Sequence, residues 1–347
     1  MRFRVGLLLG LFATVIAVGL AFASEKSDAN GNFVRLMGAG ASFPAPLYNK
    51  WFKDYHALHQ NVQVDYQSVG SGSGIKNFIN KTVDFGASDA AMTPEEISKV
   101  DVGAQLLPMT AGSIVLSYNL KGVPELKLSR EAYAGIFLGK VKKWNDPLIA
   151  KTNPGVKLPD SPVHVVVRAD ASGTSFVFSK HLSAISPEWA KNPGFGTMPN
   201  WPAGTRSKGN EGVTAGIMTT PGAIGYLEYG YAKGQKLPMV ELENKAGKYI
   251  KPTNESAQAA LAAVELPENL IAWLPDPQGE KSYPIVTYTW LLCYKQYRDA
   301  KKLEALKSVI EYGLTEGQKS SEELGYVPLP QNVAGKIRTA LDNIHAK

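Results

Sequence analysis

The chain has one cysteine among its 347 residues, which excludes an intramolecular disulfide. Cys293 lies in the apolar run Trp290-Leu291-Leu292-Cys293-Tyr294, and such a run predicts a buried, unreactive thiol. Histidine is also scarce: His56 and His59 lie three residues apart on a predicted helix, but no third metal ligand is near them. We therefore expect no metal site and no cofactor, and a fold stabilised by its apolar core.

Beyond residue 23 the chain lacks any apolar run long enough to span a bilayer. Before it, a basic start at Arg2 and Arg4 leads into an apolar run over residues 5–20 and then Ala21-Phe22-Ala23. This order is typical of a cleaved secretory signal peptide over residues 1–23, with an uncleaved N-terminal anchor as the alternative. The sequence thus predicts an exported, periplasmic protein.

Charge is not concentrated anywhere in the chain. Removing residues 1–23 takes away Arg2 and Arg4 and lowers the formal net charge from +6 to +4. The lysines are scattered and are not interleaved with aromatic residues, so we expect no nucleic-acid partner. A mild positive field would still attract a small anion.

The most informative stretch lies between two apolar segments in the middle of the chain. Residues 163–167 predict a buried strand, and residues 176–182 can continue as a helix. Between them stands Arg168-Ala169-Asp170-Ala171-Ser172-Gly173-Thr174-Ser175. Free backbone N–H groups and hydroxyls at a helix N-terminus favour an anion, and Arg168 adds a charged fork suited to a tetrahedral oxyanion.

Similar turns occur in the first part of the chain. Ser42 and Phe43 follow a predicted first strand, Ser71 follows a strand over residues 62–67, and Asp89 ends a strand over residues 83–89. Each alone has an ordinary explanation as a helix cap or turn residue; we predict that Ser42 is an N-cap. Together with the stretch around Arg168, they predict one anion site.

The carboxyl groups near this site have two possible roles each. Asp89 would repel a fully deprotonated anion such as sulfate, but it could accept the proton of hydrogen phosphate. It could instead cap the next helix or make an Asx turn. Asp170 could orient the Arg168 guanidinium, or it could cap the helix that follows.

Strands and helices alternate along the rest of the chain, which predicts an α/β class with ligands at the carboxyl ends of the strands. Further strands are expected over residues 114–120, 222–226 and 285–293, and helices over residues 130–138, 211–218, 302–312 and 330–345. Asn210 is the predicted cap of the helix over residues 211–218, and a capping box opens the helix after Thr93. Residues 226–231 are expected to form a strand and a turn.

Several long motifs resemble those of a known family. They are Gly38-Ala39-Gly40-Ala41-Ser42-Phe43-Pro44-Ala45-Pro46, Asp84-Phe85-Gly86-Ala87-Ser88-Asp89, Arg168-Ala169-Asp170-Ala171-Ser172-Gly173-Thr174-Ser175-Phe176 and Pro221-Gly222-Ala223-Ile224-Gly225-Tyr226. In these the mature chain is similar, over essentially its whole length, to the periplasmic phosphate-binding proteins of Pst-type ABC transporters (the PstS type).

This resemblance implies a two-lobed periplasmic binding protein fold of type II, with phosphate in the cleft between the lobes. It implies a discontinuous lobe I over residues 24–110 and 287–347, and a lobe II over residues 111–286. It also implies a monomer that delivers phosphate to a membrane permease and its ATPase. The phosphate contacts implied are Ser42, the Phe43 N–H, Ser71, Asp89, Arg168, Ser172, Gly173 and Thr174, with Asp170 paired to Arg168.

Three departures from the family pattern are visible. Ser42 replaces a threonine, Ser71 stands in Gly-Ser-Gly-Ser-Gly instead of Gly-Ser-Ser-Gly-Gly, and Ala171 replaces a glycine.

Two other functions are compatible with the same turns. A secreted phosphatase or other hydrolase could use one of the serines as a nucleophile, but no histidine lies in the Ser/Gly turns to act as its base. The same fold could also bind another oxyanion; Asp89 argues against sulfate and molybdate, whereas arsenate is protonated like phosphate. We therefore expect a binding protein that is not an enzyme.

Overall fold

The computed structural model describes residues 33–262 and 264–347, within which Val34–Lys347 form one compact unit. The predicted signal peptide, residues 1–23, lies outside the described residues. The strands are β1 (Val34–Gly40), β2 (Val62–Ser68), β3 (Phe85–Ser88), β4 (Ala104–Tyr118), β5 (Lys127–Leu128), β6 (His164–Arg168), β7 (Thr205–Ser207), β8 (Ala223–Glu228), β9 (Glu241–Glu243), β10 (Tyr249–Ile250), β11 (Val286–Tyr294), β12 (Gln296–Tyr297) and β13 (His345–Ala346).

Helices alternate with these strands along most of the unit. They are α1 (Ala45–Leu58), α2 (Ser71–Ile79), α3 (Pro94–Ser98), α4 (Arg130–Phe137), α5 (Pro147–Ala150), α6 (Gly173–Ile185), α7 (Pro187–Lys191), α8 (Gly209–Thr219), α9 (Tyr229–Gly234), α10 (Asn254–Leu261), α11 (Ala300–Leu314), the 3₁₀ helix η1 (Glu316–Ser320), α12 (Ser321–Leu324) and α13 (Gln331–Asp342). No helix of the described ranges is long and apolar enough to cross a membrane.

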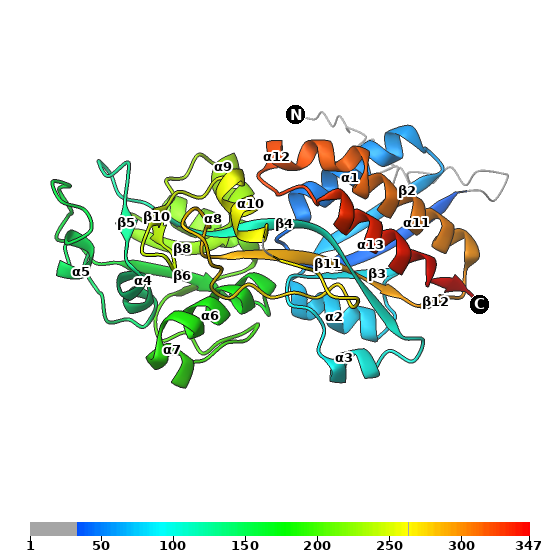
Figure 1. Cartoon of the computed structure of the whole chain (residues 1–347), viewed down its shortest axis with the longest axis horizontal. Helices are drawn as coiled ribbons and strands as arrows, with labels where there is room; N and C mark the ends of the chain where they lie inside the picture. The colour runs from blue at the N-terminus through cyan, green and yellow to red at the C-terminus, as the bar shows by residue number, and fades with distance from the viewer. Residues whose placement is uncertain (1–32, 263) are drawn as a thin grey trace, which may run out of the picture. The chain divides into compact units, whose positions relative to one another are not determined.

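The main sheet of the described residues has eight strands in the order β2-β1-β3-β11-β4-β8-β6-β7. Strand β1 lies between the parallel strands β2 and β3, and β6 lies between the parallel strands β7 and β8. Strands β4 and β11 are antiparallel to each other and join these two parallel groups (Figure 1). The two groups, each with its own helices, define two lobes, as expected for the predicted fold class.

Strand β4 is longer than the sequence predicted. Its first part pairs with β11, and its last part, from Ile114 to Tyr118, pairs with β8. The prediction of residues 114–120 missed the first part because it contains Pro108 and Gly112, which are unusual in strands. Pro108 is tolerated because the register shifts next to its partner Trp290, so the missing N–H falls at an irregularity of the ladder.

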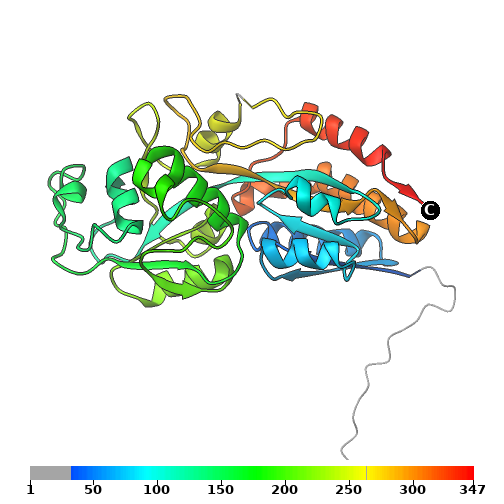
Figure 2. The same ribbon diagram turned by 90° about the horizontal axis from the view of Figure 1, so that it is seen from below.

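The last helices of the chain pack beside the first ones. Helix α11 contacts β1 and α1, and α12 also contacts α1. In Figure 2 the red C-terminal helix accordingly lies along the half of the unit that is coloured blue and orange. The chain therefore enters the second lobe through β4 and comes back through β11.

Aromatic packing in the second lobe connects its core to a buried polar region. The Tyr226 ring lies 4.7 Å from the Phe178 ring and 5.1 Å from the Trp201 ring, measured between centroids. Its hydroxyl accepts a hydrogen bond from the Arg168 N–H at 3.0 Å and bonds the Ser175 hydroxyl at 2.6 Å. The aromatic core thereby fixes the positions of the end of β6 and the start of α6 relative to each other.

Several predicted helix starts can be compared with the structure. The capping box is confirmed, with Thr93 and Glu96 bonding each other's backbone N–H groups. The predictions for Ser42 and Asn210 are wrong: Pro44 stands at the N-cap of α1 and Lys208 at that of α8, and neither has a side-chain cap bond. The predicted turn over residues 226–231 is the end of β8 followed by the short helix α9.

Candidate anion-binding site

The residues singled out in the sequence come together at the carboxyl ends of β1, β3 and β6 and at the start of α2. Each is buried: Ser42, Phe43, Ser71, Asp89, Arg168, Ser172 and Thr174 all expose 2% or less of their surface, and Gly173 is buried too. Parallel strands put their following turns at one edge of a sheet, which explains the gathering within each lobe. The meeting of the two lobes adds the contacts described next.

Gly173, the first residue of α6, lies directly against the first lobe. A Cβ atom placed on it would lie 2.6 Å from both Asp89 Oδ2 and Ser71 Oγ. Carbon and oxygen cannot approach so closely, so only glycine fits here. The absence of a side chain brings the N-terminus of α6 next to Asp89.

Arg168 carries the positive charge of the site. Its Nε and Nη2 atoms donate to the Asp170 carboxylate at 2.9 and 2.6 Å, and Nη1 donates to Thr174 Oγ1 at 3.4 Å. Burial disfavours the charge, but the Asp170 partner raises the pKa of Arg168. Asp170 Oδ1 also accepts from the Gly209 N–H at 3.0 Å, so the carboxylate fixes the guanidinium to the start of α8.

Asp89 makes no helix cap, since Thr93 caps α3. Its Oδ1 atom accepts from the Thr289 hydroxyl at 2.8 Å, while Oδ2 faces Gly173. Burial raises the pKa of Asp89 to about 7, against the lowering effects of the Thr289 hydroxyl and the Arg168 charge. A carboxyl with this pKa can share a proton with a ligand at neutral pH.

The hydroxyls of the site are already used as acceptors. Ser42 Oγ accepts from the Asn210 N–H at 3.1 Å and from Asn210 Nδ2 at 2.9 Å. Ser172 Oγ, at the N-cap of α6, accepts from the Ser175 N–H at 3.1 Å. Ser71 Oγ accepts from the Asp89 N–H at 3.2 Å.

In residues 33–262 and 264–347, Ser42, Ser172 and Thr174 donate no hydrogen bond to another protein group. A hydroxyl whose oxygen accepts still has its proton to donate. These hydroxyls therefore suit the oxygens of an anion.

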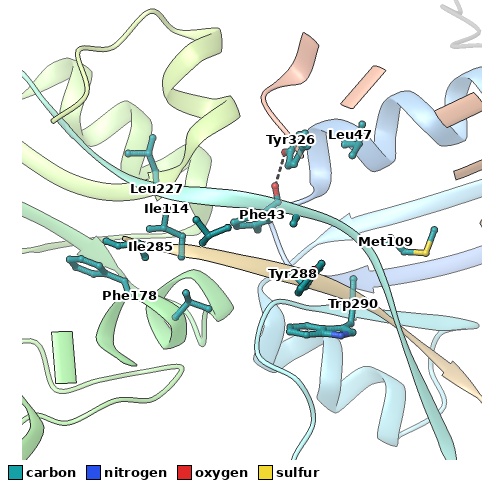
Figure 3. Packing of buried hydrophobic residues seen from close by; sticks show 14 of the residues in the cluster. Phe43, Leu47, Met109, Ile114, Phe178, Leu227, Ile285, Tyr288, Trp290 and Tyr326 are labelled. Carbon is teal, nitrogen blue, oxygen red and sulfur yellow. Dashed lines mark hydrogen bonds between the residues drawn. The ribbon is translucent and has the colours of Figure 1, made fainter. Parts of the chain in front are cut away.

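The loop that carries Ser42 and Phe43 is fixed by two tyrosines. Tyr231 donates its hydroxyl proton to the Ser42 carbonyl at 2.6 Å, and Tyr326 donates to the Phe43 carbonyl at 2.7 Å. Figure 3 shows the second bond and the Phe43 ring among buried apolar side chains. A Cβ on Gly112 would lie 2.9 Å from that ring, so the ring packs directly on the β4 backbone. The phenylalanine side chain thus anchors the loop while its backbone remains at the site.

Two of the departures from the family pattern face each other. The Gly72 N–H donates to the Ala171 carbonyl at 2.9 Å, and a Cβ on Gly72 would lie 2.4 Å from Ala171 Cβ. Only one of these two positions can carry a Cβ in this arrangement. Glycine at 72 therefore leaves room for the methyl group of Ala171, whose φ is not positive.

Sequence reasoning missed Asn210, Thr289 and Tyr226 as neighbours of the site. Thr289 lies in an all-buried strand, where a hydroxyl needs a partner, and this was the signal available. The predicted inert thiol is confirmed: Cys293 is buried, and burial raises its pKa to about 12.

The one buried histidine of the described residues has both ring nitrogens bonded, and those residues offer no metal site. His181 is buried, with Nδ1 bonded to the Pro275 carbonyl at 2.7 Å and Nε2 to the Tyr133 hydroxyl at 2.8 Å. Among residues 33–262 and 264–347, no group of three or more His, Cys, Asp or Glu side chains could hold a metal ion.

Comparison with known proteins places this chain in the PBP superfamily. Residues 24–316 match the family model described as the PBP superfamily domain. Solved structures agree in fold: a phosphate-binding protein from Stenotrophomonas maltophilia has a TM-score of 0.72 at 19% identity, covering 88% of this chain and 93% of that one. A Clostridium perfringens protein, described as a putative phosphate ABC transporter substrate-binding protein with bound phosphate, has a TM-score of 0.64 at 18% identity, covering 86% and 100%.

Curated relatives narrow the class. The phosphate-binding protein PstS of Pasteurella multocida is 42% identical over 309 residues, covering 87% of this chain and 88% of the relative. The protein of the same name from Methanocaldococcus jannaschii is 38% identical over 360 residues, covering 94% and 92%. The chain belongs to the PstS family of phosphate-binding proteins.

Proposed function

We propose that this protein binds one inorganic phosphate ion between its two lobes and makes or breaks no bond in it. The observation that carries the proposal is the composition of the site. The hydroxyl groups, the Arg168 guanidinium and the backbone N–H groups at the start of α6 can donate hydrogen bonds, whereas Asp89 Oδ2 can accept one. This combination fits a tetrahedral oxyanion that retains a proton. The names of the relatives support the same ligand.

The proposed phosphate contacts are those that the family resemblance implies: Ser42, the Phe43 N–H, Ser71, Asp89, Arg168, Ser172, Gly173 and Thr174, with Asp170 holding Arg168. Each oxygen of the ion would receive donors from these groups, and the ion's own proton would go to Asp89. Sulfate has no proton to give at neutral pH, so its oxygens would face the Asp89 carboxylate without a bond. Selectivity against sulfate follows from that unpaired acceptor.

The proposed division of the chain has lobe I at residues 24–110 and 287–347 and lobe II at residues 111–286. Phosphate would touch both lobes at once, so its binding favours the closed arrangement. We further propose that the protein is exported to the periplasm by the signal peptide over residues 1–23. There it would act as a monomer and deliver phosphate to an ABC permease.

Calorimetric titration of the mature protein tests this proposal. Ligand is first removed by partial unfolding, and phosphate and sulfate are then titrated into wild type and Asp89→Asn near pH 7. We expect one phosphate per protein and no sulfate heat for wild type, and a gain of sulfate binding for Asp89→Asn, because the amide can donate to a sulfate oxygen. A folded, ligand-free wild type that binds no phosphate would overturn the assignment.

A further inference from the structure

We infer that Asn210 is a positioning residue that turns the Ser42 and Thr174 hydroxyls into donors for the bound anion. This inference rests on the proposed function. The Asn210 side chain is fully buried and lies at the second residue of α8, although it does not cap that helix. Its hydrogen bonds go to residues far away in the sequence instead.

The orientation of the Asn210 amide follows from its partners. Its Oδ1 atom accepts from the Glu228 N–H at 3.0 Å, and a backbone N–H can only donate. The Nδ2 group must therefore point the other way, where it lies 2.9 Å from Ser42 Oγ and 3.3 Å from Thr174 Oγ1. Both protons of the amide are then used on these two hydroxyl oxygens.

Each hydroxyl receives a second donor. Ser42 Oγ also accepts from the Asn210 N–H, and Thr174 Oγ1 also accepts from Arg168 Nη1. With two donors directed at each oxygen, the hydroxyl proton has to point away from Asn210 and Arg168. That direction is toward the proposed anion site, so both hydroxyls are set to donate to the ligand when the lobes are together.

The same amide also joins the two lobes. Ser42 follows β1 of the first lobe, while Asn210 and Thr174 belong to α8 and α6 of the second. The Asn210–Ser42 bonds therefore exist only in the closed arrangement. Loss of the amide should weaken phosphate binding and speed phosphate release, because both preorganisation and closure suffer.

The test compares phosphate affinity and release rate in wild type, Asn210→Ala, Asn210→Asp, Ser42→Ala and the double variant Ser42→Ala/Asn210→Ala. Aspartate keeps the acceptor for the Glu228 N–H but replaces the donors by an oxygen that attracts the hydroxyl protons. Asn210→Ala removes three side-chain hydrogen bonds, and the loss of the two that reach the hydroxyls predicts an affinity loss of about 5- to 100-fold. The loss should be larger for Asn210→Asp. Since the two residues act together, the double variant should lose at least about fivefold less than the product of the single losses.

Asn119→Ala is the matched control. The Asn119 amide donates to the Ile217 and Met218 carbonyls at the other end of α8, away from the site. It should lower the melting temperature and leave phosphate affinity unchanged. The inference is overturned if wild type binds phosphate while Asn210→Ala binds it equally well, or if the single losses multiply in the double variant. Failure of wild type to bind phosphate would instead overturn the proposed function.

Discussion

Adding one methyl group at Gly72 should weaken phosphate binding while leaving the free protein at least as stable. In the structure a Cβ on Gly72 would lie 2.4 Å from Ala171 Cβ, whereas carbon atoms pack at about 3.5–4.0 Å. The two segments would have to separate by more than about 1 Å at this point. The bond from the Gly72 N–H to the Ala171 carbonyl, now 2.9 Å, would then be broken.

The magnitude follows from these two effects. Loss of the hydrogen bond costs about 1 kcal/mol and steric overlap about 1–2 kcal/mol, which together weaken phosphate binding about 30- to 150-fold. Neither effect destabilises the free protein, whose lobes we expect to be apart, because both arise where Gly72 of one lobe meets Ala171 of the other. Because Gly72 lies within α2 and has no positive φ, alanine there should stabilise the helix by up to about 1 kcal/mol.

Calorimetry of phosphate binding and thermal unfolding without ligand measure the two quantities separately. The double variant Gly72→Ala/Ala171→Gly removes the opposing methyl group and should recover most of the lost affinity. Gly335→Ala in α13, where an added Cβ meets nothing within 4 Å, is the control and should leave binding unchanged. An affinity that does not fall for Gly72→Ala, or a fall that Ala171→Gly does not reverse, would refute the reasoning.

Two further predictions concern stability. Both carboxyl oxygens of Glu228 are buried without a hydrogen bond among the described residues, and burial raises the pKa of this carboxyl well above its usual value. The free energy of unfolding should therefore fall as the pH rises above 4.5, because the unfolded chain loses this proton before the folded protein does. The free energy of unfolding of Glu228→Gln, measured in urea, should therefore rise relative to wild type by about 1.4 kcal/mol per pH unit above 4.5, until the pH passes the folded-state pKa. Burial lowers the pKa of His181 to about 4. The free energy of unfolding of wild type should therefore fall by about 1.4 kcal/mol per pH unit as the pH drops from 6.5 to 4, and His181→Gln should not show this fall.

Exposed residues supply the controls for these two variants. Glu268 and His164 are exposed, so in Glu268→Gln and His164→Gln the free energy of unfolding should depend on pH as it does in wild type. Parallel pH profiles for Glu228→Gln and wild type would show that the buried carboxyl does not change its protonation on unfolding. For His181, the same conclusion would follow if the variant lost stability with acid as steeply as wild type.

Local sequence determined the turns that form the candidate site. Ser71, Arg168 and Ser172 could be found because a polar, glycine-containing turn follows a predicted strand at each of them, and Asp89 because it ends a short predicted strand. Strand, turn and helix propensities act over a few residues, so a single stretch contains the information needed. The alternation of these units was likewise enough to predict the α/β class and, with the motif resemblance, two lobes.

Tertiary structure alone decided what surrounds those turns. Asn210 bonds Ser42 across 168 residues of chain, and Thr289 bonds Asp89 across 200, so no local pattern could pair them. The caps predicted for Ser42 and Asn210 failed for the same reason: a polar side chain near a helix start takes the partner that folding brings to it, and here these two residues bond each other across the lobes. The opposition of Gly72 and Ala171 is also a property of two packed backbones, visible only when both are in place.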